Sequence, residues 1–204
     1  MEEILQTRVS IEQVLGLGFL GLIVYGLIEL VYLYFFRKYE GIKEYKQTSV
    51  NFIFTIGMNM VIAAIFGVMS TAVLGLAGYQ YALFATELSW HWWIYGLLVY
   101  EFFYWVQHWL AHKVRLFWCL HSPHHAPESM NMFVGFNHQF LETFFYMPFF
   151  LGFLPAICGV HPIIIISISA VDIIWGNLLH VNDHLVKDGR YGFLEKFLQT
   201  PSHH

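Results

Sequence analysis

Histidine is the residue type whose number and spacing in this chain point most clearly to chemistry. The chain has 204 residues and 12 histidines, and a neutral imidazole nitrogen is the commonest metal ligand among protein side chains. Nine of the histidines fall in short clusters: His108, His112, His121, His124, His125, His180, His184, His203 and His204. Histidines three or four residues apart can converge on one cation, so the pattern predicts a metal site.

The first cluster consists of His108 and His112. A four-residue spacing places both rings on one face of a helix, on adjacent turns. In an isolated pair of this kind, the two histidines are more often polar residues at a helix end than metal ligands. Glu101 lies two helical turns before His108. It fits two interpretations equally, a carboxylate that orients a ligand ring or a polar contact between helices.

The second cluster, His121, His124 and His125, is a sharper signal. The Ser122-Pro123 pair inside it has the composition of a helix start. Two adjacent histidines cannot face the same way on a helix, so one ring is expected to serve one metal ion. Its neighbour then serves a second ion or bridges to the first.

Two common kinds of zinc site fit this sequence poorly, the zinc protease site and the single structural zinc site. The chain has no His-Glu-x-x-His sequence, so the general-base glutamate of a zinc protease is missing. A structural zinc site is closed by four ligands, and nine clustered histidines fit two ions better than one. Imidazole suits zinc, copper, iron and nickel, so the ligand type leaves the metal open. His138 lies outside the clusters and is interpreted as a hydrogen-bonding residue, and His91 and His161 as structural.

The composition is typical of a membrane protein, with 57% hydrophobic, 19% aromatic and 12% charged residues. Long apolar runs cover residues 14–36, 52–76 and about 92–109. Residues 139–179 can form a helical hairpin that turns near 159–162, either as two full crossings or as a shorter re-entrant pair. The sequence thus predicts an all-α, multi-pass integral membrane protein with four to five transmembrane or re-entrant helices.

The positions of lysine and arginine predict the orientation. Alternating spans place residues 37–50, 107–138 and 180–204 on one side, with nine of the ten basic residues, and leave Arg8 opposite. This bias predicts that the loops are cytoplasmic, so the histidine clusters would form a cap on the cytoplasmic face. No basic stripe with interleaved aromatic residues occurs, which argues against nucleic acid as a partner. The Gly75-Leu76-Ala77-Gly78 segment suggests a close contact between helices.

The order of the histidine clusters resembles that of the fatty acid hydroxylase / sterol desaturase superfamily. The matching elements are His-x3-His at 108–112, His-x2-His-His at 121–125, a helix end at His180 and Thr-Pro-Ser-His-His at 200–204. The eight-residue gap between His112 and His121, together with residues 198–204, looks most like the alkylglycerol monooxygenase branch. The resemblance covers roughly residues 95–204.

This resemblance implies a non-haem di-iron enzyme with two Fe ions, O2 as co-substrate and an external electron donor. The expected domains are N-terminal transmembrane helices at 1–90 and a fatty acid hydroxylase-like domain at 91–204. All nine clustered histidines become candidate iron ligands, with His184 the weaker of its pair because other branches keep one histidine there. The family's last box continues beyond His204 with another histidine pair, so the domain is expected to be incomplete at its C-terminus.

The function implied by the resemblance is hydroxylation or desaturation of a lipid or sterol-like substrate within the membrane. A reductase, cytochrome or ferredoxin type of protein would act as redox partner. The alternative is a membrane metal-binding or transport protein without redox catalysis. Such a protein needs ionisable residues along a path through the spans, and Glu29, Glu101 and Asp172 form a sparse route. A bis-histidine haem carrier is a further rival, but its ligands belong inside facing helices rather than at helix ends.

Overall fold

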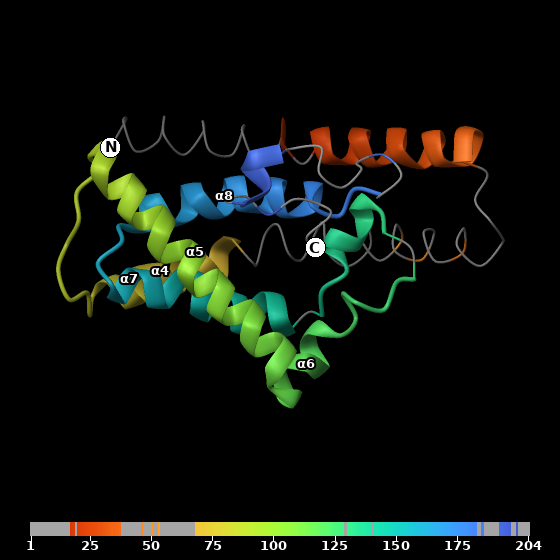
Figure 1. Cartoon of the computed structure of the whole chain (residues 1–204). Helices are drawn as coiled ribbons and strands as arrows, with labels where there is room; N and C mark the ends of the chain where they lie inside the picture. Colours follow the sequence, from red (N-terminus) through yellow and green to blue (C-terminus); the bar gives the residue numbers. More distant parts are fainter. Residues whose placement is uncertain are drawn as a thin grey trace. The chain divides into compact units, whose positions relative to one another are not determined.

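The computed structural model describes residues 17–18, 20–37, 46, 50, 53, 68–128, 130–139, 141–182, 185, 192–196 and 199 (Figure 1). All regular structure in these residues is helical, as the sequence predicts. Residues 20–32 are α-helical. The other elements are η1 (Leu33–Arg37), α4 (Val68–Tyr79), α5 (Trp90–Lys113), α6 (Arg115–His121), η4 (Met132–Phe136), η5 (Glu142–Tyr146), η6 (Phe149–Phe153), α7 (Leu154–Ile157), α8 (Pro162–Leu178) and η7 (Gly192–Lys196).

The structure corrects the prediction of a multi-pass integral membrane protein with four to five transmembrane or re-entrant helices. Within the described residues, no helix combines the length and the apolarity that crossing a bilayer requires. Helix α8 has 17 residues, about 26 Å against a bilayer core of about 30 Å. Helix α5 has 24 residues but carries tryptophans, tyrosines and histidines along its length. The cytoplasmic face expected for the histidines was derived from those spans and is corrected with them.

The chain divides into two compact units, each built from discontinuous segments. Unit 1 comprises Met1–Phe52, Pro127–Phe136 and Asp172–His204, and unit 2 comprises Ile53–Ala126 and Asn137–Val171. Both units draw on segments from either side of residue 90, where the sequence suggests a domain boundary. The clusters from His108 to His125 belong to unit 2, and His180 belongs to unit 1.

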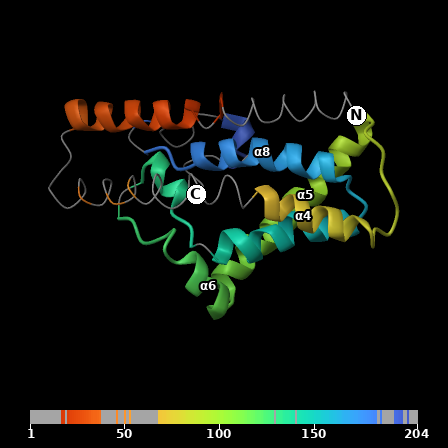
Figure 2. The ribbon, with the colours of Figure 1, turned by 180° about the vertical axis from the view of Figure 1, so that it is seen from behind.

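The core of unit 2 forms where α4, η6 and α7 pack together and α5 contacts η6 and α7. Figures 1 and 2 show α4 beside the teal segment of η6 and α7 from both sides. The buried side chains of this core are Tyr100, Leu151, Ala156, Val160, Ile164, Ile165 and Ile168. Two glycines bring backbones into contact, because a Cβ added at Gly78 would lie 2.6 Å from the Phe153 carbonyl oxygen, and one at Gly152 2.7 Å from the Thr71 carbonyl oxygen.

The turn expected near residues 159–162 is present between α7 and α8. Gly159 adopts φ +86°, a left-handed conformation that favours glycine. A Cβ there would also lie 2.5 Å from the Phe84 carbonyl oxygen. The Thr86 hydroxyl donates a 2.7 Å hydrogen bond to the Gly159 carbonyl oxygen, which ties the turn to the loop before α5. Pro162 then opens α8, a position that suits proline because its missing N–H has no helical partner.

Unit 1 is organised around the buried carboxylate of Glu29. Its Oε2 accepts a 2.8 Å hydrogen bond from the Met132 backbone N–H, and its Oε1 accepts one of 2.6 Å from the Asn182 backbone N–H. The Asn182 side-chain amide donates to the Met130 carbonyl oxygen at 2.7 Å. One acidic side chain therefore joins three segments that are distant in the sequence, which supports a structural role for Glu29.

Replacing Glu29 with alanine will destabilise the fold. The change leaves two buried backbone N–H groups without their acceptor, at about 1–3 kcal/mol each, so the expected loss is about 2–6 kcal/mol. A thermal or denaturant unfolding curve measures it. An unchanged midpoint would show that these two N–H groups find water or another acceptor.

The stability contribution of Glu29 also depends on pH. Burial raises the pKa of its carboxyl above the ordinary 4.5, although the two backbone N–H donors oppose the shift. The folded state therefore holds the proton more tightly than the unfolded state does. The contribution of Glu29 to stability is fully present below pH 4.5 and is lost as the pH rises through the raised pKa. Glu29→Gln keeps one acceptor and removes the charge, so its stability will vary less with pH over that window.

Candidate metal centre

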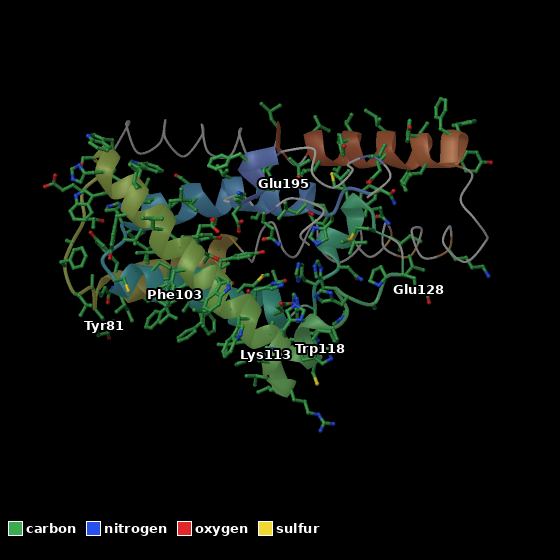
Figure 3. All side chains as sticks on the ribbon, viewed as in Figure 1. Tyr81, Phe103, Lys113, Trp118, Glu128 and Glu195 are labelled. Carbon is green, nitrogen blue, oxygen red and sulfur yellow. The ribbon has the colours of Figure 1, made fainter. Side chains whose placement is uncertain are left out.

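A one-residue bend between α5 and α6 brings the first two histidine clusters together. Val114 is extended, with φ −104° and ψ 119°, and it caps both helices. Its N–H donates to the Leu110 carbonyl oxygen at 2.8 Å, and its own carbonyl oxygen accepts from the Trp118 N–H at 2.9 Å. Figure 3 labels Lys113 and Trp118, one on each side of the bend. The last turn of α5 therefore faces α6, which contacts it.

His108 and His112 share one face of α5, as their spacing predicts. Their ring centroids are 4.8 Å apart, and their Nε2 atoms are separated by 3.2 Å. The burial of both rings is incomplete, since His108 is half-buried and His112 exposed. The pair therefore presents two imidazole nitrogens to the same point at the end of α5.

His121 and His125 complete a group of four with this pair. His121 ends α6 and is 1% exposed. Its ring centroid lies 4.8 Å from that of His108 and 5.1 Å from that of His112. The Nε2 atoms of His121 and His125 are 3.1 Å apart. One ring nitrogen from each of the four histidines lies within 4.8 Å of the others.

The adjacent His124 turns away from this group of four. Its ring plane makes an angle of 88° with that of His125. It stacks instead on His138, with centroids 4.4 Å apart and planes 11° from parallel. Ser122 ends α6 rather than starting a new helix, and the His124 N–H bonds the His121 carbonyl oxygen across the following turn at 3.0 Å. His125 therefore belongs to the group of four, whereas His124 belongs to a neighbouring stacked pair with His138.

Two residues of this centre were not predicted from the sequence, His138 and Glu142. The Glu142 carboxylate is fully buried. Its Oε1 accepts from His121 Nδ1 at 2.8 Å, and its Oε2 accepts from His138 Nδ1 at 3.0 Å. These three side chains form a second group whose ligand atoms lie within 4.8 Å of one another. The His-x3-Glu spacing inside an apolar stretch is the signal that could have found them.

The local electrostatics favour the ionised form of Glu142 and the neutral form of His112. Burial raises the pKa of Glu142, but the hydrogen bonds from His121 and His138 and the electrostatic interaction with both rings outweigh it and lower the pKa to about 2. Burial also lowers the pKa of His112, and nearby His121 and Lys113 lower it further. A neutral imidazole carries the lone pair that binds a metal, so lowering the pKa of His112 favours metal binding near neutral pH.

Of the other predicted ligands, the two that the structure describes, His124 and His180, are not part of this group. His180, in unit 1, is buried, and its Nδ1 donates to the Gly176 carbonyl oxygen at 2.7 Å. His184, His203 and His204 lie outside the described residues. Glu101 is exposed on α5, and the carboxylate that contacts a clustered ring is Glu142.

The group of four fits a metal ion by its donor chemistry and its spacing. Its donors are all imidazole nitrogens, which suit zinc, copper, iron and nickel. Two nitrogens 3.1–3.2 Å apart, each about 2.1 Å from a shared cation, subtend an angle of about 95–100° at that cation. This angle lies between the octahedral and tetrahedral values. The cluster could therefore hold an ion of any of these four metals.

Known proteins are similar to the half of the chain that carries these histidines. The model of the fatty acid hydroxylase family matches residues 93–204. Alkylglycerol monooxygenase of Xenopus tropicalis is 30% identical over 122 residues, which cover 58% of this chain and 25% of the relative. Alkylglycerol monooxygenase of Homo sapiens is 29% identical over 130 residues, 61% of this chain and 27% of the relative. The chain spans about a quarter of the length of these curated relatives. No solved structure matches it.

Proposed function

Because the chain belongs to the fatty acid hydroxylase family, we propose that it is a non-haem di-iron, O2-dependent hydroxylase of a lipid. The similar relatives are named alkylglycerol monooxygenases, so an alkylglycerol is the first substrate to test, ahead of sterol-like lipids and of desaturation. The observation that carries the proposal is the group of four histidines whose ring nitrogens converge within 4.8 Å.

Nine histidines would hold the two irons in this proposal. His108, His112, His121 and His125 would hold the first ion. The other five candidate ligands are His124, His180, His184, His203 and His204. Bound iron supplies the redox chemistry that activates O2, which zinc cannot do because it has no redox chemistry. The histidines hold the ions, and Glu142 keeps the ring of His121 in place.

An external electron donor is required by the balance of the reaction. Inserting one oxygen atom of O2 into a C–H bond consumes two electrons and two protons and releases one water molecule. Histidine side chains supply no electrons, so a redox partner of the reductase, cytochrome or ferredoxin type would deliver them. Desaturation has the same electron demand but leaves no oxygen atom in the product, which makes the two outcomes separable by isotope labelling.

The test is anaerobic loading of the full chain with Fe²⁺, followed by metal analysis, a visible spectrum and turnover of a 1-O-alkylglycerol. With ¹⁸O2 and a chemical reductant, the expected product carries one ¹⁸O atom. A Soret band in the purified protein would instead favour a haem carrier. Tight metal binding without any O2- and reductant-dependent product would favour the metal-binding alternative and contradict the hydroxylase.

A further inference from the structure

The Glu142 carboxylate occupies an unusual position because both of its oxygens bond a histidine ring. Oε1 lies 2.8 Å from His121 Nδ1 and Oε2 lies 3.0 Å from His138 Nδ1. The carboxylate itself is fully buried, so these contacts are shielded from competing water. His121 belongs to the group of four, whereas His138 stacks on His124. The Glu142 side chain therefore contacts both halves of the centre, which are the group of four and the stacked His124–His138 pair.

These contacts determine which ring nitrogen carries the proton. An ionised carboxylate accepts hydrogen bonds and cannot donate them. Both histidines must therefore carry a proton on Nδ1, and Nε2 is then the unprotonated nitrogen of each neutral ring. In His121 this is the atom that lies 3.1 Å from His125 Nε2, inside the group of four. Glu142 thus determines that the lone pair of His121 faces the proposed metal position.

The segment that carries Glu142 is anchored on both sides of it. Before it, the Asn137 side-chain amide donates to the Pro123 carbonyl oxygen at 2.7 Å. After it, the Tyr146 hydroxyl donates to the Gln107 carbonyl oxygen at 2.5 Å, next to His108. Glu142 also opens the π-helical turn η5, in which its carbonyl oxygen accepts from the Met147 N–H. π-turns of this kind are frequent at functional sites.

The geometry points to Glu142 as a positioning residue that holds His121 and His138 in the Nδ1–H form and so couples the two halves of the metal centre. The inference rests on the proposed metal-binding function, since Glu142 would act on the metal through His121 and not as a catalytic residue. Carboxylates that orient a ligand histidine typically change metal affinity by about 10- to 100-fold when they are mutated.

The first test is the tautomer of the histidines in the metal-free full chain. Long-range ¹H–¹⁵N NMR distinguishes Nδ1–H from Nε2–H rings. In the wild type, the signals that disappear in His121→Asn and His138→Asn variants are expected to be of the Nδ1–H type. An Nε2–H signal for His121 would overturn the inference, and this result needs no substitution of Glu142.

The second test is titration of the wild type, Glu142→Gln and Glu87→Gln with Co²⁺, followed by its visible absorption. A glutamine can accept from one histidine but must donate to the other, so the affinity is expected to fall about 10- to 100-fold. Glu87 is exposed before α5, and its variant controls for the loss of one charge. Wild-type affinity in Glu142→Gln would overturn the inference. Failure of the wild type to bind Co²⁺ would instead contradict the proposed function, and the tautomer test would still decide the role of Glu142.

Discussion

Under the proposed function, alanine at both His108 and His112 will abolish tight metal binding and, with it, O2-dependent turnover. The two rings provide half of the four converging nitrogens. A four-ligand site contributes about 10–16 kcal/mol of binding free energy, so losing two ligands removes roughly 5–8 kcal/mol, or about four to six orders of magnitude in affinity. Metal content after dialysis and a Co²⁺ titration measure the loss.

The matched control for this double variant is His91→Ala. His91 lies on the same helix, near its first residue, where it is exposed and bonds Ser89. Removing it deletes an imidazole from α5 without touching the cluster, so metal content should stay at the wild-type level. Equal losses in the two variants would mean that metal is held by dispersed surface histidines. Circular dichroism of all three proteins establishes that the helices persist.

Alanine at Gly78 will destabilise unit 2, whereas alanine at Gly75 on the same helix will not. The added methyl at Gly78 would lie 2.6 Å from the Phe153 carbonyl oxygen, a backbone atom that cannot rotate away. Overpacking of this kind costs about 1–3 kcal/mol, and the melting temperature should fall by roughly 2–12 °C. At Gly75 the nearest atom is the Gly152 carbonyl oxygen at 3.8 Å, an ordinary contact.

The Gly75→Ala variant makes this comparison specific to packing. Replacing a helical glycine by alanine is favourable by about 0.5–1 kcal/mol when space permits. Thermal unfolding should therefore rank Gly75→Ala at or above the wild type and Gly78→Ala below it. An equal shift of the melting temperature in both variants would contradict this prediction, because it would mean that the α4–η6 contact relaxes around an added methyl. The small-residue pattern at 75–78 predicted a close approach, but the structure was needed to assign it to Gly78.

Local spacing was the part of the centre that could be predicted from the sequence. The four-residue separation of His108 and His112 is close to one helical turn, so their shared face follows without knowledge of the fold. The divergence of His124 and His125 follows in the same way, because neighbouring side chains in a helical turn point in different directions. Their placement against α5 depends instead on the bend at Val114, which no motif marks.

Long-range contacts explain what the sequence did not reveal. Glu142 reaches His121 across 21 residues, and this contact exists because η5 folds back on the end of α6. Apolar composition was also ambiguous, since it is shared by membrane spans and buried helices. Ile164 and Ile165 of α8 are at most 1% exposed because they pack in the core of unit 2. Hydropathy therefore indicated burial but did not identify the surroundings.

The bend at Val114 makes the number of residues between the clusters a geometric constraint. One extended residue separates α5 from α6, and His121 lies at the end of the seven residues of α6. Inserting or deleting one residue within α6 would rotate His121 by about 100° about the helix axis and shift it by about 1.5 Å. Its lone pair would then point away from His108 and His112. While α6 keeps this length, the eight positions between His112 and His121 can vary in identity far more freely than in number.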